Sequence, residues 1–267
     1  MAVKQASKPT EYLLAIDAGN TNIMFALFSN GSPLHRWRVA TIHHRTADEY
    51  AVILSQLMQN NGIEKRQIRN IIIGSVVPPI MLALGKLCAN FFKIKPLIVG
   101  DNIKIPIKVK IDNPKEIGAD RVLNAVAAHK LYKKPAIIVD FGTATTFDIV
   151  DKHGSYLGGV IAPGINLSLS ALQAAASQLP MVWIKKPAKV IGKNTKEAMQ
   201  SGIYWGYIGL IEGMVARIKT ELKEKPIVIA TGGLAPMFAE NTKVIEKIEP
   251  DLTLIGLNEI YKFQRKK

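Results

Sequence analysis

The sequence has a single cysteine, Cys88, among 267 residues. One cysteine cannot form a disulfide within the chain, and it lies in an apolar stretch from Leu84 to Phe92. The composition therefore excludes the small secreted scaffolds that disulfides hold together. A reducing, cytoplasmic location is expected.

Long apolar runs are also absent. The longest candidate, Gly202 to Ile218, contains Glu212 and Arg217 and is shorter than the roughly 20 residues that a membrane-spanning helix needs. The segment from Met1 to Glu11 is polar and lacks the apolar centre of a signal peptide. We therefore expect neither export nor a membrane partner.

Positive charge is in excess, because 35 Lys and Arg against 21 Asp and Glu give a formal net charge of +14. The basic residues are spread evenly, apart from a C-terminal cluster from Lys262 to Lys267. Nucleic acid, acidic lipid or a small anionic substrate would suit such a charge. No helix-turn-helix or aromatic RNA platform accompanies it, so we interpret the cluster as a solvated end and expect no specific nucleic-acid partner.

What is present is a large apolar fraction, 48% of the residues, which excludes disordered and fibrous classes. Apolar periodicity predicts, in the first part of the chain, a strand, a hairpin of two further strands around Asn30-Gly31, a helix, a strand, a helix and a short strand. The ranges are Tyr12 to Ile16, Ile23 to Ser29, Leu34 to Val39, Ala47 to Gln59, Asn70 to Ser75, Pro79 to Phe92 and Leu97 to Val99.

The second part repeats this order. Its predicted strands are Ala136 to Val139, Thr146 to Val150, Tyr156 to Ile161 and Ile227 to Ala230, its helices are Ile165 to Ser177 and Thr195 to Glu224, and a last short strand and helix lie near Thr253 to Phe263. The repetition predicts two similar α/β domains, 1–120 and 121–267, each with a mixed sheet and helices on its faces, and a cleft between them.

Both copies open with an apolar strand that ends in an Asp-x-Gly turn followed by threonine. The first is Asp17 to Thr21 and the second begins at Asp140. A carboxylate at a strand end can hold a hydrated metal ion, and glycine lets backbone N–H groups approach phosphate oxygens. One such turn is also typical of ordinary loops. Two at duplicated positions favour a nucleotide triphosphate gripped from both sides.

A third glycine-rich turn, Thr231 to Ala235, follows the strand that ends at Ala230. It is interpreted either as a plain strand-to-helix loop or as a place where a base or ribose packs on backbone. Together the three turns resemble the phosphate and adenosine elements of the actin, Hsp70 and sugar-kinase superfamily, which implies a duplicated ribonuclease-H-like, actin-like ATPase fold.

Six motifs narrow this resemblance. They are Asp17-Ala18-Gly19-Asn20-Thr21-Asn22, Gly74-Ser75-Val76-Val77-Pro78, Gly118-Ala119-Asp120-Arg121, Asp140-Phe141-Gly142-Thr143-Ala144, Gly158 to Gly164, and Gly192-Lys193-Asn194-Thr195. In this order they resemble type III pantothenate kinase. The resemblance implies transfer of the γ-phosphoryl group of ATP to the primary hydroxyl of pantothenate, the first step of coenzyme A biosynthesis, by a homodimeric enzyme.

The resemblance also implies roles for individual residues. Asp120 would accept the proton of the attacking hydroxyl, with Gly118, Ala119 and Arg121 holding the substrate; Arg121 could pair with the carboxylate of pantothenate. Taken alone, Asp120-Arg121 is also typical of a helix N-terminus beside a surface charge. Thr195 would touch pantothenate; taken alone it is also typical of a cap of the long helix, and both roles can hold at once.

The remaining implied contacts involve the nucleotide and its cations. Asp17 would orient hydrated Mg²⁺ at the β and γ phosphates, and Asp140 would bind a monovalent cation, K⁺ or NH₄⁺. The nucleotide contacts implied by the resemblance are Asp17, Ala18, Gly19, Asn20, Thr21, Asn22, Ile23, Met24 and Thr143.

One position departs from the family pattern. Seven residues before Gly118, where many members carry a tyrosine in the substrate site, this chain has Ile111. An aliphatic side chain keeps a wall of the pocket but loses a hydroxyl, so the substrate pocket is expected to differ while the catalytic residues are retained.

Several other interpretations stay open. The glycines at 202, 206, 209 and 213 have helical spacing and would let another helix approach, either across a homodimer interface or within the chain. A kinase of the same superfamily with another acceptor is one rival function, and a nucleic-acid-associated transcriptional accessory factor is another. The Gly118 to Arg121 motif argues against the first rival, and the three aspartates Asp17, Asp120 and Asp140 argue against the second.

Overall fold

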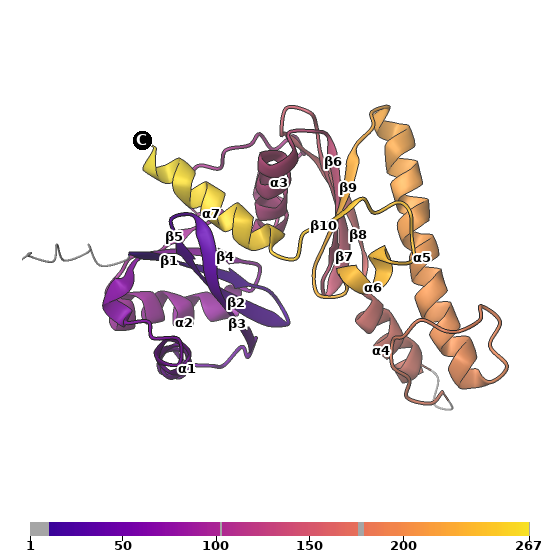
Figure 1. Ribbon diagram of the computed structural model, residues 1–267, viewed down its shortest axis with the longest axis horizontal. Coiled ribbons are helices and arrows are strands. Elements are labelled where there is room, and N and C mark those ends of the chain that lie inside the picture. The colour runs from indigo at the N-terminus through magenta and orange to yellow at the C-terminus, as the bar shows by residue number, and fades with distance from the viewer. Residues whose placement is uncertain (1–10, 102, 176–178, 267) are drawn as a thin grey trace, which may run out of the picture. The chain divides into compact units, whose positions relative to one another are not determined.

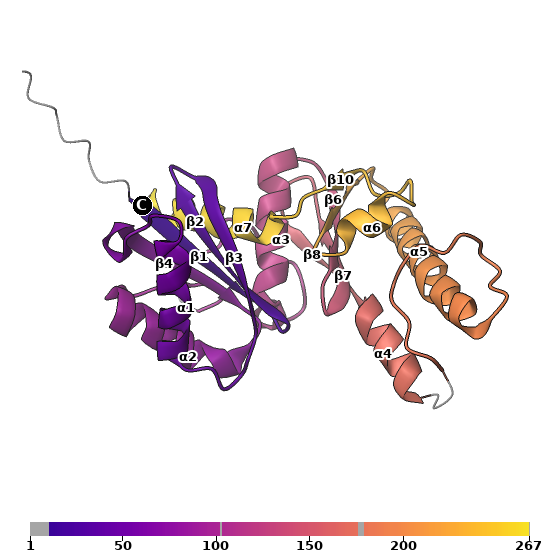
Figure 2. The same cartoon turned by 60° about the horizontal axis from the view of Figure 1, so that its bottom comes forward.

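The computed structural model describes residues 11–101, 103–175 and 179–266. Within them the chain forms two compact units. Unit 1 consists of the residues up to Pro106, Lys115–Leu123 and the residues from Thr253 onward; unit 2 consists of Ile107–Pro114 and Asn124–Leu252. Figures 1 and 2 show each unit as a sheet with helices on its faces.

Unit 1 contains a five-stranded sheet in the order β3-β2-β1-β4-β5. The strands β1 to β3 form an antiparallel meander, and β4 and β5 add in parallel. Its elements are β1 (Tyr12–Ala18), β2 (Asn22–Ser29), β3 (Ser32–Ala40), α1 (Ala47–Gln59), β4 (Ile68–Ser75), α2 (Met81–Lys86) and β5 (Leu97–Ile98), with 3₁₀ turns at Lys65–Gln67 and Pro78–Ile80 and a π-helical turn at Leu87–Phe92. A further 3₁₀ turn, Pro114–Glu116, lies where the chain passes from unit 2 back to unit 1.

Local sequence explains these elements. Asn30 and Gly31 both have positive φ, 50° and 82°, as the predicted two-residue hairpin requires. Thr46 and Glu49 form a capping box at the start of α1, whose buried side chains Tyr50, Leu54 and Met58 recur every fourth residue. This stripe faces the core of unit 1, on the face of the sheet that α1 and α2 cover (Figure 1).

Unit 2 repeats the topology of unit 1. Its sheet has the order β10-β9-β6-β7-β8, with the meander β6 to β8 antiparallel and β9 and β10 parallel. The elements are β6 (Ala136–Phe141), β7 (Ala144–Val150), β8 (Tyr156–Pro163), α4 (Ile165–Ala175), α5 (Thr195–Leu222), β9 (Ile227–Thr231), α6 (Ala235–Ala239) and β10 (Lys247–Ile248). The predicted duplication and α/β class are confirmed.

The course of two helices differs from the predicted division of the chain at residue 120. Helix α3 (Ala119–Tyr132) begins in unit 1 and continues in unit 2, and α7 (Leu252–Arg265) returns the C-terminal part of the chain to unit 1. Unit 1 is therefore not the predicted segment 1–120, because α7 packs on the face of its sheet that α1 and α2 leave uncovered (Figure 1).

Glycines make this packing of α7 possible. A Cβ atom at Gly256 would lie 2.2 Å from the carbonyl oxygen of Leu123 on α3, so the two helices meet there at the backbone. A Cβ atom at Gly74 of β4 would lie 2.7 Å from the Leu123 side chain and 3.3 Å from that of Leu257. Leu123 thus fills the space that these two glycines leave.

Smaller differences concern element ends. The last short strand, expected near Thr253, is β10 and comes before that residue, and α6 was not predicted. Residues 176 and 177, at the predicted end of the helix from Ile165, lie outside the described residues, as does Lys267 of the basic cluster. No helix of the described chain is long and apolar enough to cross a membrane.

Candidate active site

The first Asp-x-Gly turn joins β1 to β2 in unit 1. The N–H of Gly19 donates to the carbonyl oxygen of Asn22 at 3.0 Å, and the Thr41 hydroxyl donates to the carbonyl oxygen of Gly19 at 2.7 Å. Asn20, Thr21 and Asn22 are exposed. The tight closure of the turn therefore presents polar groups that could contact a phosphate.

The two residues after this turn differ in access. Ile23 is fully buried in the core of unit 1, so only its backbone could reach a ligand, and Met24 is half-buried. Ala18 is also buried. Of the predicted nucleotide contacts in this segment, side-chain contacts are thus limited to the polar residues and Met24.

Asp17, at the end of β1, shares unit 1 with Asp120 in the first turn of α3. Burial raises the pKa of Asp17 to about 6; a hydrogen bond with the Thr253 side chain lowers it, and the negative charge of Asp120 raises it. Burial and a neighbouring negative charge both disfavour the charged form of a carboxyl group, and a nearby cation restores it. Asp17 therefore fits a site for a divalent ion.

Asp120 itself is held by its neighbours. Its Oδ1 accepts a hydrogen bond of 2.7 Å from the backbone N–H of Arg121. A Cβ atom at Gly118 would lie 2.6 Å from the same oxygen, so glycine is needed for the carboxylate to take this position. Asp120 and Arg121 are half-buried, so both retain access to solvent.

The second turn gathers three predicted motifs in unit 2. The Asn124 side chain donates to Oδ2 of Asp140 at 2.9 Å. A Cβ atom at Gly232, whose φ is 89°, would lie 2.8 Å from Oδ1 of Asp140, and one at Gly164 would lie 2.2 Å from the carbonyl oxygen of Thr143. The glycine-rich turns after β8 and β9 therefore pack directly against the Asp140 to Thr143 turn.

This turn also fits a monovalent cation. Asp140 is half-buried, Gly142 and Thr143 are exposed, and the buried Oδ1 of Asn124 has no hydrogen-bond partner among the described residues. K⁺ is bound by oxygen ligands of this kind, carboxylate, amide and carbonyl. Among the described residues no group of three or more His, Cys, Asp or Glu side chains gathers as a metal site.

Ile111 follows a short connecting segment that unit 2 holds through a single parallel β-bridge between Val109 and Tyr156. The N–H of Lys110 donates to the carbonyl oxygen of Tyr156 at 2.8 Å, and the N–H of Tyr156 donates to that of Lys108 at 2.8 Å. Ile111 comes within 3.8 Å of the position of a Cβ on Gly158. Ile111 thus belongs to unit 2, whereas the motif from Gly118 to Arg121 belongs to unit 1.

The same segment is fastened by an ion pair whose effect on stability depends on pH. Lys110 Nζ lies 2.8 Å from Oδ2 of Asp151. Burial would raise the pKa of Asp151, but hydrogen bonds from Lys110 and from the backbone of Ser155 and His153 outweigh it and lower the pKa to about 2.

Because the folded pKa is below the ordinary value, this stabilisation is present above about pH 4 and is lost as the pH falls toward 2. We expect Asp151→Asn to lower the free energy of unfolding by about 1 kcal/mol at neutral pH, since Lys110 is half exposed and solvent screens the pair. The difference from the parent should vanish near pH 2 in urea titrations. Asp112→Asn, an exposed change on the same segment, should have no such effect at either pH.

Thr195 is the first residue of α5 and is exposed. The cap of this helix is Asn194, whose side chain accepts from the N–H of Glu197 at 2.9 Å, so the alternative that Thr195 caps the helix is wrong. A Cβ atom at Gly192 would lie 2.4 Å from the N atom of Ala198, which explains the glycine of this motif. The Thr195 hydroxyl is not used by the cap.

Comparison with known proteins decides the family. Residues 13–217 match the family model of type III pantothenate kinase. The chain belongs to the type III pantothenate kinase family. A curated type III pantothenate kinase from Paramagnetospirillum magneticum is 55% identical over 251 residues, which cover 94% of this chain and 96% of the relative.

Solved structures agree with the fold of this kinase family member. A Campylobacter jejuni protein assigned to the Baf family of transcriptional activators is 18% identical, with a TM-score of 0.60 over 95% of this chain and 100% of that chain. A Sinorhizobium meliloti protein assigned as a 2-dehydro-3-deoxygalactonokinase is 12% identical, with a TM-score of 0.55 over 94% and 96% of the two chains. The predicted actin-like, sugar-kinase fold is confirmed.

Two residues that support the site escaped the sequence motifs. Asn124 lies one helical turn after Asp120, but its side chain donates to Asp140, 16 residues further on, and the spacing on α3 carries no signal for that contact. Thr253, which contacts Asp17, is the second residue of the last helix, far away in sequence, and carries no local signal.

Proposed function

We propose that this protein transfers the γ-phosphoryl group of ATP to the primary hydroxyl of pantothenate, the first step of coenzyme A biosynthesis. Membership of the type III pantothenate kinase family carries the proposal, and the pairing of Asp17 with Asp120 in one unit supports it. A kinase of this family uses ATP and a divalent metal ion. We propose the cytoplasm as the place of the reaction.

In the proposed mechanism Asp120 accepts the proton of the attacking hydroxyl. The hydrogen bond from the Arg121 N–H to one oxygen of Asp120 fixes the orientation of the carboxylate that takes the proton. Arg121 pairs with the substrate carboxylate, and Gly118 and Ala119 line the bound substrate. The family resemblance assigns further substrate contacts to Ile111 and Thr195.

The nucleotide is assigned to the turns that follow β1 and β6. Asp17 would hold hydrated Mg²⁺, which neutralises charge on the β and γ phosphates. The backbone from Ala18 to Met24, with the side chains of Asn20, Thr21 and Asn22, lines the phosphates, and Thr143 adds a contact from unit 2. Phosphoryl transfer depends chiefly on positioning and electrostatics, and these turns are proposed to supply both.

The first experiment measures ADP release with and without pantothenate. Turnover that requires pantothenate and is higher in potassium than in sodium buffer is the expected result. Release of ADP only with a different alcohol would favour another kinase of the superfamily. Folded protein without pantothenate-dependent turnover would overturn the proposed reaction, and the same protein should then be tested for nucleic-acid binding and its salt dependence.

A monovalent cation, K⁺ or NH₄⁺, is assigned to Asp140 with Asn124. Asp140→Asn removes the charge that attracts the cation, so we expect turnover in potassium buffer to fall about tenfold or more, to the level in sodium buffer. The measurement is ADP release against KCl concentration. Glu221→Gln, an exposed change on α5, should leave the potassium response as it is; a normal response in Asp140→Asn would exclude this assignment.

We propose that the protein is a homodimer and that its interface is the face of α5 that carries the glycines. A Cβ atom at Gly202, Gly206 or Gly209 would meet no atom of the described chain within 4 Å, so these glycines leave an open surface on α5 among the described residues. Sedimentation equilibrium should give a dimer. Gly206→Glu places a charge on this face and is expected to yield a folded monomer; a dimer of unchanged affinity would move the interface elsewhere.

A further inference from the structure

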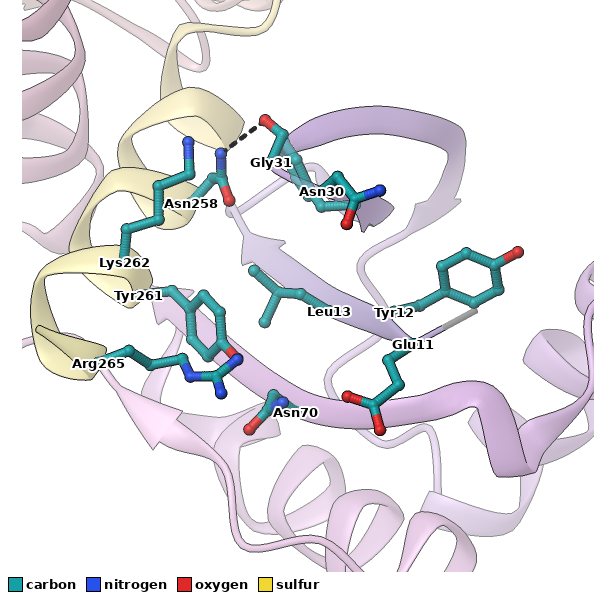
Figure 3. Close-up of a pocket in the computed structure, with 11 residues that line it drawn as sticks. Glu11, Tyr12, Leu13, Asn30, Gly31, Asn70, Asn258, Tyr261, Lys262 and Arg265 are labelled. Atoms are coloured by element: carbon teal, nitrogen blue, oxygen red, sulfur yellow. Dashed lines mark hydrogen bonds between the residues drawn. The ribbon is translucent and has the colours of Figure 1, made fainter. Parts of the chain in front are cut away.

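Unit 1 contains a pocket away from the candidate active site. Its volume is about 210 Å³, and it lies beneath α7 at the beginning of β1 (Figure 3). Leu13 lines it, four residues before Asp17 on the same strand. Since a strand rises about 3.3 Å per residue, the backbone positions of Leu13 and Asp17 are about 13 Å apart.

The interior of the pocket is apolar. Its floor is formed by Leu13 and Phe28, which are 6% and 3% exposed, and one wall is the ring of Tyr261, which is 9% exposed. Figure 3 shows Tyr261 standing beside Leu13. An apolar or flat group of a ligand would lose contact with water by lying on these side chains.

The rim of the pocket is polar and rich in hydrogen-bond donors. Lys262 and Arg265 of α7 contribute two positive charges. Side-chain amides and one carboxylate complete it: Asn30, Asn70, Asn258 and Glu11.

The single acidic group is partly neutralised from outside. The carboxylate of Glu11 lies 3.7 Å from the Arg69 guanidinium, which does not line the pocket. The Lys262 ammonium donates one hydrogen bond to the Glu259 carboxylate at 2.7 Å, and the Arg265 guanidinium donates to the Tyr261 hydroxyl at 3.2 Å. An ammonium has three donors and a guanidinium five, so both can also bind an anion.

The rim is built on a fixed frame. The Asn258 side chain donates to the carbonyl oxygen of Gly31 at 2.9 Å, which fastens α7 to the β2–β3 turn (Figure 3). A Cβ atom at Gly31 would lie 2.9 Å from Nζ of Lys262, so glycine at this position lets the lysine lie over the turn.

We propose that this pocket binds a small organic anion, with a flat apolar body on Leu13, Phe28 and Tyr261 and a carboxylate or phosphate monoester at Lys262 and Arg265. Both anionic groups match the donors on the rim. The pocket is smaller than the roughly 300 Å³ at which drug-sized sites begin, so the ligand is the size of a single substituted ring.

Benzoate and phenyl phosphate are the probes, and neutral benzamide is the control for charge. In ¹H–¹⁵N spectra of the whole protein, benzoate should shift the side-chain amide signals of Asn70 and Asn258 saturably, with a Kd on the order of 1 mM for so small a ligand. A tighter Kd for phenyl phosphate would identify the phosphate ester as the preferred group, and a tighter Kd for benzoate the carboxylate.

The decisive variant is Lys262→Gln with Arg265→Gln, matched by Lys266→Gln, an exposed lysine of the same segment that does not line the pocket. The double variant should weaken binding at least tenfold, and the control should match the parent. A backbone spectrum of the double variant that matches the parent's would establish that the double variant is folded. Equal binding to parent and double variant, equal binding of benzamide, or no saturable shift would each overturn the proposal.

Discussion

Replacement of Asp120 by asparagine is expected to lower kcat for pantothenate phosphorylation by about 10³-fold. Asparagine keeps the size of the side chain and can still accept the hydrogen bond from the Arg121 N–H, but it cannot accept the proton of the attacking hydroxyl. General-base catalysis contributes about 10² to 10⁴ in rate. The Kd of ATP should change little, because the proton acceptor is not a phosphate contact in the proposed mechanism.

The matched control is Asp48→Asn. Asp48 also lies in the first turn of a helix of unit 1, α1, and is exposed. Single-turnover ADP formation and ATP titration of both variants separate chemistry from binding. If Asp120→Asn retained kcat within about threefold, Asp120 would not be the base. If it lost ATP binding instead, Asp120 would belong with Asp17 to the metal and nucleotide site.

Gly256→Ala is expected to cost about 2 to 3 kcal/mol in the free energy of unfolding. The added methyl group would lie 2.2 Å from the Leu123 carbonyl oxygen and 2.8 Å from its Cα, so a backbone, not a flexible side chain, must move. Thermal denaturation should show a Tm lower by about 4 to 10 °C. Since Leu123 is one turn from Asp120, kcat should fall as well, even well below the Tm.

Gly85→Ala on α2 is the control for this prediction. It is a glycine in a helix of unit 1 whose Cβ position meets no described atom within 4 Å. Alanine there should leave stability unchanged or raise it by up to about 1 kcal/mol through helix propensity. A Gly256→Ala protein as stable as Gly85→Ala would mean that α7 does not approach α3 as closely as described.

The sequence predicted those features that local patterns determine. Alternating strands, the Asn30-Gly31 turn and the Asp-x-Gly turns each depend on neighbouring residues, and their repetition was enough to predict two similar sheets. The closeness of Gly232 to Asp140, by contrast, was not predicted, because the Thr231 to Ala235 turn was interpreted only as a loop or as a contact for a base or ribose.

Contacts between distant segments were not predictable. Nothing near Gly256 indicates that this glycine faces the backbone of α3, because a glycine within a helix is equally compatible with an open surface, as at Gly85. The return of α7 to unit 1 and the contact of Thr253 with Asp17 have the same origin. At the start of α5, Asn194 and Thr195 are both good caps, so only the backbone geometry decides between them.

The return of α7 also has a consequence during synthesis on the ribosome. The sheet of unit 1 is complete in sequence once β5 ends at Ile98, yet α7, which covers its second face, begins only at Leu252. The sheet that emerges first is therefore among the last to be fully covered. The surface around Gly74 stays without its contact from Leu257 until all of unit 2 has been synthesised. Nascent chains that stop before α7 would present this apolar face to chaperones and proteases.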